Sequence, residues 1–564
     1  MTHLAVARFA MIAALVLLPM AGNGQGAPTS APRPETLEIP APPGTSRDGV
    51  YIQAPAPQAR TVTLPPSIDV RTFRITGLYS VPIDDAIAVL APWTARTLAP
   101  TDLQRAVDAL TAFIRSRDLL VAEAYLPEQD FRDGVVEIAV FEGRLGRPQL
   151  QLAPDLRVRP AVVERFVESL RAGDTLRGDN LEQSLLLLND LPGIRVDASL
   201  APGAQAGLVD LLATVENDGN PLTARVAIDN AGLRVAGEYR TDATLRWRSP
   251  LGLGDLLNLR LLASHTGGQK LGSLTYGLPI NGHGTRIGLR MSEQSYRLAQ
   301  EFAPLGAHGR QGAISLLASH PLLRRATRNI TLSASYTELH SSDRQDAVGA
   351  ESDSRQHVAS LGVTADFRDT WFGGGQSVLQ TQVYAGDTSL RTAALAALDA
   401  APGGLGVAGR YTILRLRAQR VQVIDANSNL TLSILAQAAS RNLDPGIELA
   451  IGGPDAVRAY PSGELFADQG RIVRVDYRRA VRIFESMPTV LSAFVDHARV
   501  QVNRNPLPTD ISNKRSFGGY GLAVTQDLGA RVTLQGSLAW RATARPAGDP
   551  DRRPRVLVSL VAQF

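Results

Sequence analysis

Segments in which apolar and polar residues alternate are the feature that most constrains the fold of this chain. They recur through residues 222–564, and clear examples lie at 329–336, 429–436 and 533–540. Successive side chains of a β-strand point to opposite faces, so each segment forms a strand with one apolar and one polar face. No convincing helical stretch follows Gly219. This region is therefore predicted to be a large antiparallel β structure.

Two architectures suit such strands. A soluble sandwich buries the apolar face in a core, whereas a membrane β-barrel exposes that face to lipid and turns the polar face toward a wet lumen. The barrel is favoured because some polar faces are charged, as where Arg474, Asp476 and Arg478 alternate with apolar or aromatic residues. The last strand also ends on an aromatic residue, Phe564, which resembles the assembly signal of bacterial outer-membrane proteins.

The length of this region sets the size of the barrel. At roughly 20 residues for each strand with its loop, residues 221–564 make about 16 strands. Long polar segments are predicted to be outward-facing loops, because outer-membrane barrels keep their periplasmic turns short. These segments are 338–357, 387–409 and 503–516.

The N-terminal part of the chain is predicted to carry a targeting signal and a linker. In residues 1–26, Arg8 precedes an apolar stretch from Phe9 to Met20. This stretch is shorter than the roughly 20 residues of a spanning helix, so we predict a secretory signal peptide. Residues 27–66 hold 10 of the 35 prolines, which favours an extended linker.

Residues 67–220 are predicted to form two small α+β domains that share the order strand, helix, helix, strand, strand. In the first domain, 67–146, apolar residues recur every three or four positions over 101–114, which indicates a helix. The second domain, 147–220, repeats the order, and Asn180 is predicted to cap its second helix. Short apolar runs predict the strands, at 72–75, 121–126, 135–140, 150–152, 194–200 and 208–215.

Motifs of enzymes, cofactor sites and metal sites are absent from the sequence. It contains no H-E-x-x-H, G-x-S-x-G or Walker A pattern, its 8 histidines are scattered, and it has no cysteine. We therefore predict a protein that is not an enzyme and that binds neither a cofactor nor a metal. The net charge of +4 is too small to indicate a nucleic-acid partner.

Four short motifs lie at 125–130 and 188–193 in the N-terminal domains, and at 228–232 and 250–255 where the β region begins. Together they resemble the two-partner secretion transporters, whose barrels follow polypeptide-transport-associated (POTRA) domains. The resemblance covers nearly the whole chain after the predicted signal peptide. It implies an outer-membrane β-barrel of about 16 strands, preceded by two POTRA domains in the periplasm.

A fifth motif consists of Val457, Arg458, Ala459 and Tyr460. It resembles the V-R-G-Y/F motif at the tip of an inward-folded loop in this family, although Ala459 replaces the usual glycine. Glycine accepts backbone conformations that alanine avoids, so the local turn is less permissive here. The matching segment continues to Asp468 and Gly470.

Phe494 and Asp496 resemble the F-x-D-x-G strand motif of the same family, with Ala498 in place of the glycine. The apolar neighbours fill the other face of this predicted strand, so Asp496 is expected to face the lumen. The resemblance implies that Arg458 pairs with Asp496 and sets the resting state of the channel. Two ordinary solvated charges, whose pairing contributes about 0–1 kcal/mol, are the alternative.

The resemblance further implies the export of one large, unfolded, β-helical exoprotein, such as an adhesin, a haemolysin or a contact-dependent toxin. The POTRA domains are expected to bind this client by pairing it with their sheet edges. Outer-membrane lipids and the barrel assembly machinery are further expected partners. Two other functions stay open: an assembly factor or insertase for other barrels, which usually carries more POTRA repeats, and a general diffusion porin, which does not need two periplasmic domains.

Overall fold

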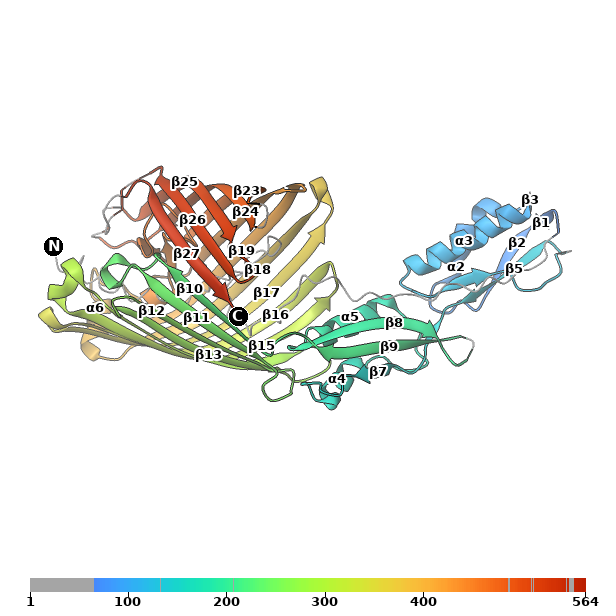
Figure 1. The fold of residues 1–564 in the computed structure, drawn as a ribbon, viewed down its shortest axis with the longest axis horizontal. Helices are drawn as coiled ribbons and strands as arrows, with labels where there is room; N and C mark the ends of the chain where they lie inside the picture. Colours follow the sequence, from blue (N-terminus) through green and yellow to red (C-terminus); the bar gives the residue numbers. More distant parts are fainter. Residues whose placement is uncertain are drawn as a thin grey trace.

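The structure is a computed structural model, and it describes residues 65–131, 133–205, 207–484, 487–508, 510, 512–543, 545–546 and 552–564. Two small α+β units project from one end of a closed β-barrel (Figure 1). In the described residues the barrel has 16 strands, which confirms the predicted fold class. The predicted signal peptide and the predicted linker up to residue 64 lie outside the described residues.

The barrel strands follow chain order around the wall, and each is antiparallel to its neighbours. Five residue pairs join the first strand, β10, to the last, β27. Beyond these pairs, the backbone N–H of Phe564 donates to the carbonyl of Ala224 at 2.8 Å, and the N–H of Ala224 donates to the carbonyl of Phe564 at 3.1 Å. The strands are β10 (Leu222–Asp229), β11 (Arg240–Arg248), β12 (Leu256–Ser264), β13 (Gln269–Pro279), β14 (Arg286–Arg297), β15 (Ala307–Arg324), β16 (Arg328–Gln345), β17 (Ala350–Asp369), β18 (Gly375–Leu390), β19 (Gly409–Asp425), β20 (Ser428–Ala439), β23 (Gln469–Phe484), β24 (Met487–Gln501), β25 (Lys514–Asp527), β26 (Val532–Arg541) and β27 (Arg555–Gln563).

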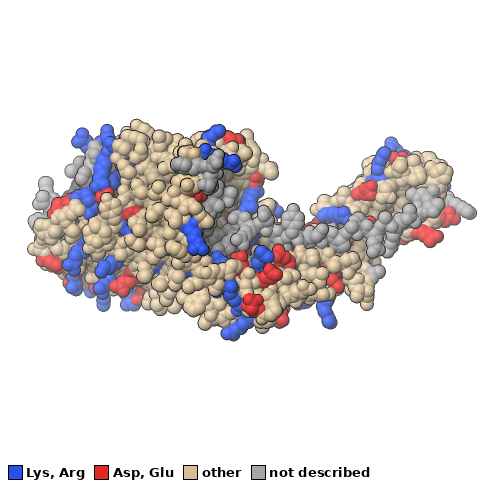
Figure 2. Space-filling view, in the orientation of Figure 1, with Lys and Arg blue, Asp and Glu red and all other residues tan. Residues whose placement is uncertain are grey.

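Side-chain exposure distinguishes the barrel from a sandwich. On β24 the apolar Leu491 and Val495 are 43% and 57% exposed, whereas Asp496 is 1% exposed. The apolar face therefore points outward and the polar face inward, as a membrane barrel requires. Much of the visible barrel wall carries no charged side chain (Figure 2).

Two predicted features of the barrel were wrong. The segment 338–357 is not a loop, because β16 and β17 pair through most of it and only a short turn, η5 (Asp346–Val348), separates them. These strands extend beyond the apolar band, so their outward side chains are polar and the sequence looks like a loop. A helix also follows Gly219: α6 (Ala393–Ala400) lies between β18 and β19. Alanine is the best helix former, and the Thr392 side chain accepts a hydrogen bond from the N–H of Leu395 at the helix start.

Several short elements complete the barrel region. A small ribbon, β21 (Leu449–Ile451) paired with β22 (Leu465–Ala467), lies in the connection between β20 and β23. No helix in the described residues is both long and apolar enough to cross a membrane. Besides η5, the short 3₁₀ helices among the described residues of this region are η3 (Arg234–Ala236), η4 (Gln300–Leu305), η6 (Trp371–Gly373) and η7 (Pro445–Ile447).

The first N-terminal unit packs two helices on a small sheet. In that sheet β5 lies between β2, which is parallel to it, and β4, which is antiparallel. Apolar residues of both helices and the sheet form one buried core. The elements are β1 (Ile68–Val70), β2 (Thr72–Thr76), α2 (Ile83–Leu90), η2 (Ala91–Trp93), β3 (Arg96–Leu98), α3 (Pro100–Ser116), β4 (Glu123–Tyr125) and β5 (Val135–Phe141).

The second unit repeats the helix pair on a sheet whose central strand is β9. Strand β8 pairs antiparallel with β9 on one side, and β6 and β7 pair parallel with it on the other. Its elements are β6 (Arg144–Leu145), β7 (Gln149–Leu152), α4 (Pro160–Val167), α5 (Gly178–Asn189), β8 (Ile194–Pro202) and β9 (Leu208–Asn217).

The predicted cap of α5 was wrong. Asn180 lies inside the helix, which begins at Gly178 and has no side-chain cap from its own N-terminal residue. The first unit supplies the missing partners instead. The backbone N–H of Gly178 donates to the Asp118 carbonyl at 3.0 Å, and the N–H of Asp179 donates to the Asp118 carboxylate at 3.0 Å. This contact links the start of α5 to the preceding unit.

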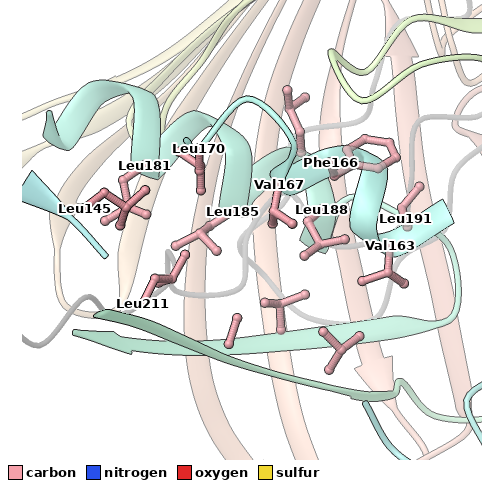
Figure 3. Packing of buried hydrophobic residues seen from close by; sticks show 14 of the residues in the cluster. Leu145, Val163, Phe166, Val167, Leu170, Leu181, Leu185, Leu188, Leu191 and Leu211 are labelled. Atoms are coloured by element: carbon pink, nitrogen blue, oxygen red, sulfur yellow. The ribbon is translucent and has the colours of Figure 1, made fainter. Parts of the chain in front are cut away.

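The core of the second unit lies between its helices and its sheet (Figure 3). Leu185 of α5 is completely buried there. We expect Leu185→Ala to lower the free energy of unfolding of this unit by about 2–5 kcal/mol, because it removes transfer energy and leaves a cavity. Urea unfolding of the full-length protein in detergent, followed by helical circular dichroism, measures the loss. Leu398→Ala, on the exposed face of α6, is the matched control and should stay within about 0.5 kcal/mol.

Candidate functional site

The connection between β20 and β23 folds into the barrel. Two residues of this connection, Val457 and Tyr460, are completely buried. They pack in one cluster with Phe494 and Phe517 of the barrel wall. Phe494 lies on β24 on the face opposite the exposed Leu491, so the loop packs against the inner wall. We call residues 440–468 the inward loop.

Arg458 makes the most extensive polar contact of the inward loop. Its Nε donates to Asp496 Oδ2 at 2.8 Å, its Nη2 to Asp496 Oδ1 at 2.6 Å, and its backbone N–H to Asp496 Oδ2 at 3.0 Å. The remaining nitrogen, Nη1, donates to Asp476 Oδ1 at 2.6 Å. The guanidinium also lies 3.5 Å from the centroid of the Phe494 ring. Arginine's planar fork suits this combination of a two-point contact, a second carboxylate and an aromatic face.

The pairing register of two strands builds the receptor for Arg458. Asp476 on β23 lies directly opposite Phe494 on β24, and Asp496 follows Phe494 by two residues. Side chains two apart share a face, so all three point into the lumen and surround one guanidinium. Gly521 on β25 leaves room for the ring, since a Cβ there would lie 2.4 Å from Phe494 Cζ.

Burial makes this contact different from a solvated pair. The exposed fractions of the three charged side chains are 9% for Arg458, 7% for Asp476 and 0% for Asp496. Burial by itself lowers the pKa of Arg458, but hydrogen bonds and attraction from Asp496 and then Asp476 raise it above its ordinary value. The guanidinium therefore stays charged. Arg474 is a second cation nearby, with its Nε 3.6 Å from Asp496 Oδ1.

The motif residues Ala459 and Tyr460 pack on β25 and on the segment just after β26. The Tyr460 ring meets Phe517 edge-on, with centroids 5.1 Å apart, and its hydroxyl hydrogen-bonds to Thr543 Oγ1 at 2.8 Å. Ala459 lies against Gly519, where a Cβ would come within 2.6 Å of the Ala459 methyl. A glycine on the wall thus makes room for the alanine that replaces glycine in the motif.

Asp468 and Gly470 lie at the base of the inward loop, away from Arg458. Asp468 is completely buried and accepts hydrogen bonds from the N–H of Leu443 at 2.9 Å and from the N–H of Arg504 at 2.6 Å. It thereby ties both ends of the inward loop to the neighbouring outer loop. A Cβ on Gly470 would lie 2.5 Å from Val500 Cγ1, so the close approach of β23 and β24 requires glycine.

Asp476 was not predicted as a partner of Arg458, although it stands on the charged face of the alternating segment on β23. Gly519 and Phe517 were also not predicted, because they contact the motif only once the barrel wall has formed.

Two sequence motifs, 188–193 and 250–255, meet at the end of the barrel nearest the α+β units. Ser249 Oγ donates to the carbonyl of Pro192 at 2.6 Å. The Leu191 side chain lies against Gly254, where a Cβ would come within 2.8 Å of it. The turn between β11 and β12 is therefore shaped to receive the end of α5.

Ion pairs strengthen this junction at the neighbouring turn. Arg324, at the end of β15, donates to both carboxylate oxygens of Asp190, at 2.7 and 2.8 Å. Arg325 Nη2 lies 2.7 Å from Asp179 Oδ1 on α5. The second unit is thus fastened to the barrel over the turns that follow β11 and β15.

Comparison with known proteins gives consistent matches. The family described as haemolysin secretion/activation protein ShlB/FhaC/HecB matches residues 209–510, and the ShlB-type POTRA domain matches residues 68–143. The heme/hemopexin transporter protein HuxB of Haemophilus influenzae (strain 86-028NP) is 24% identical over 452 residues, which cover 78% of each chain. The outer membrane transporter CdiB of Escherichia coli is 31% identical over 203 residues, 36% of this chain and 33% of the relative. The solved structure of CdiB from Escherichia coli has a TM-score of 0.72 at 19% identity, covering 90% of this chain and 93% of that one.

Proposed function

Because this chain belongs to the haemolysin secretion/activation protein family, we propose that it secretes one large, β-helical exoprotein, such as an adhesin, haemolysin or contact-dependent toxin. It is an outer-membrane transporter of the two-partner type, with its POTRA region in the periplasm. The observation that carries the proposal is a barrel that combines docked α+β units at one end with an inward loop fastened by buried ion pairs. A diffusion porin needs neither feature.

In this proposal each predicted site residue has a role. Val457, Arg458, Ala459 and Tyr460 hold the inward loop in its resting position, and Phe494 with Asp496 is the wall that receives it. Asp468 and Gly470 fix the loop base, and Phe564 is the signal read by the barrel assembly machinery. The chain acts as a conduit rather than as an enzyme, and outer-membrane lipids surround its apolar face. Residues 67–146 and 147–220 are the two POTRA domains, which follow a signal peptide at 1–26 and a linker at 27–66.

Strand β8 is the sheet edge best placed to bind the unfolded client. It pairs with β9 on one side only. The N–H of Val196 donates to the Asn189 side chain at 3.0 Å, so it points away from β9. By the two-residue period of a strand, the N–H groups of Ala198 and Leu200 point the same way. They present donors to an extended client segment, which would add a strand to the sheet.

The test uses Ala198→Pro, which removes one of these donors while leaving the N–H groups that face β9. Proline is tolerated at such edge positions. The loss of one main-chain hydrogen bond should weaken binding of the client's N-terminal segment, kept unfolded, roughly two- to tenfold. Binding to the full-length protein in detergent gives the measurement, with Ala198→Val as the matched control. The client for this test would be sought in the neighbouring reading frame, as a large secreted β-repeat protein.

Two results would contradict the proposal at different levels. Unchanged affinity in Ala198→Pro would mean that the client does not pair with β8. If cells carrying the intact chain release no more client than cells without it, the proposal that the chain transports this client is wrong. Free uptake of small solutes by the intact chain would instead favour a porin.

A further inference from the structure

A cluster of three cations lies on the outside of the barrel, at the end away from the α+β units. Arg471 lies near the start of β23, Arg499 near the end of β24, and Lys514 at the start of β25. All three side chains are exposed. They share the outward face with Val473 and Val495, because side chains two apart on a strand point the same way. None of them takes part in the inward loop or in the ion pairs around Arg458.

The height of the cluster matches the edge of the membrane. On β23 the outward residues between Arg471 and Arg479 are Val473, Val475 and Tyr477. Eight residues rise roughly 26 Å along a strand, which at a tilt of about 40° is about 20 Å of height, so these two arginines bracket most of an apolar band about 25 Å tall. Arg471 therefore lies level with the lipid headgroups of the leaflet opposite the periplasm.

The charges of the cluster are not balanced within the protein. Arg471 and Arg499 lie directly opposite each other in register. Such pairs have Cα atoms roughly 5 Å apart, and like charges in this position are destabilising. Lys514 lies opposite Gln501, diagonal to Arg499. Among the residues that the structure describes, no carboxylate pairs with any of the three cations.

Two other outward arginines at the same end of the barrel have acidic partners. Arg310 lies 3.2 Å from Glu293 on the next strand, and Arg344 lies 2.8 Å from Glu351. Arg471, Arg499 and Lys514 have no such partner among the described residues. An anion from outside the chain would offset the repulsion between them.

A cavity of about 270 Å³ adjoins the cluster. Arg499 and Lys514 line it together with the amide side chains of Gln469 and Gln501, and Gly470 leaves its floor without a side chain. The lining thus offers two cations in one hollow, whereas the Gln469 and Gln501 amides bond to each other and, from Gln501, to the carbonyls of Asn503 and Arg504. Its size suits a phosphate group with part of a sugar, and not a whole lipid.

We propose that Arg471, Arg499 and Lys514 bind a phosphate group of the phosphorylated glycolipid of the outer leaflet, lipopolysaccharide. Arginine binds phosphate with two parallel hydrogen bonds, and basic clusters at headgroup height hold anionic lipids. The acyl chains would lie against exposed apolar residues directly below, such as Val495 and Tyr520. The site lies on the outer face of the strands whose inner face carries Asp476 and Asp496, so the lipid would brace the wall that receives Arg458.

The test measures binding of bisphosphorylated lipid A to the full-length protein in detergent, by native mass spectrometry. The double variant Arg471→Gln/Arg499→Gln should bind about tenfold more weakly, because it removes charged hydrogen bonds to phosphate. Arg310→Gln/Arg344→Gln is the matched control, since it removes the same charge from the same end of the barrel, and it should bind like the wild type. Lys514→Gln gives a second, milder variant at an exposed side chain. A shift of the unboiled band on gels checks that each barrel is folded.

Further binding measurements identify the source of the anion. Dephosphorylated lipid A should bind the wild type as weakly as bisphosphorylated lipid A binds the double variant. Equal binding of the two lipids would overturn the proposal, because the phosphate would not be recognised. Displacement of the lipid by an equal concentration of inorganic phosphate would also overturn it, since the site would then be one for a free anion. Equal loss in the control variant would mean that general charge, and not this site, attracts the lipid.

Discussion

Arg458→Ala and Asp496→Ala should each reduce secreted client per inserted barrel to a small fraction of the wild-type value. Each substitution leaves buried charge without its partner: Arg458→Ala exposes Asp476 and Asp496 to each other, and Asp496→Ala leaves the guanidinium with one carboxylate. Breaking a buried pair in this way costs about 3–5 kcal/mol, and any water in the lumen reduces that cost. The inward loop would then leave its resting position while the wall remains intact.

The double variant Arg458→Ala/Asp496→Ala should secrete nearly as much client as the worse single variant, because residues that act as a pair are non-additive. Secreted client is measured for the four members of the cycle and divided by heat-modifiable barrel in the membrane. Pore conductance should change in the same variants, since the loop occupies the lumen. Arg344→Ala/Glu351→Ala removes an exposed ion pair and is the matched control. Independent, additive losses, or none, would mean that Arg458 and Asp496 do not act together.

Deletion of Phe564 should prevent most of the protein from reaching the membrane as a folded barrel. The residue is 63% exposed on the outer face, and its backbone makes two hydrogen bonds to Ala224 across the seam. If the assembly machinery reads the aromatic ring, Phe564→Ala should lose nearly as much inserted barrel as the deletion, whereas Phe564→Tyr should keep it. Trp371→Ala, at another exposed aromatic residue, should have no effect.

The comparison of Phe564→Ala with the deletion separates two causes. A deletion that fails while Phe564→Ala inserts normally would assign the role to the backbone contacts with Ala224. Normal insertion of both would refute the proposed signal. The amount of heat-modifiable protein in the membrane fraction is the measurement in every case.

The side of the barrel wall to which a strand residue points was predictable, because the two-residue period of a strand is a local pattern. Asp496 was expected in the lumen from its immediate neighbours, and the structure buries it there. The second carboxylate, Asp476, was not predicted as a partner, although its inward face was. Its position beside Arg458 depends on how β23 and β24 align, and that register is fixed by a strand pairing that no local pattern encodes.

Errors in the predicted loops have a different origin. Outward residues of β16 and β17 beyond the membrane are polar because they meet water, so alternation fails to mark the strands there. The docking of 188–193 onto 250–255 was also beyond prediction. Both segments were recognised as motifs in the sequence. The contact between Ser249 and Pro192, however, depends on how the second unit and the barrel are arranged in space.

The seam between β10 and β27 has a consequence for the order of events in folding. Asn230 and Val556 bond across it although they are 326 positions apart in the chain. Until the last strand has been made, β10 is an open edge, and such edges pair readily with other chains. Contacts between distant residues also form slowly, because the entropy of closing the loop must be lost first. The first and last barrel strands must therefore pair last, and the time that the open sheet spends in the periplasm sets its exposure to aggregation and proteolysis.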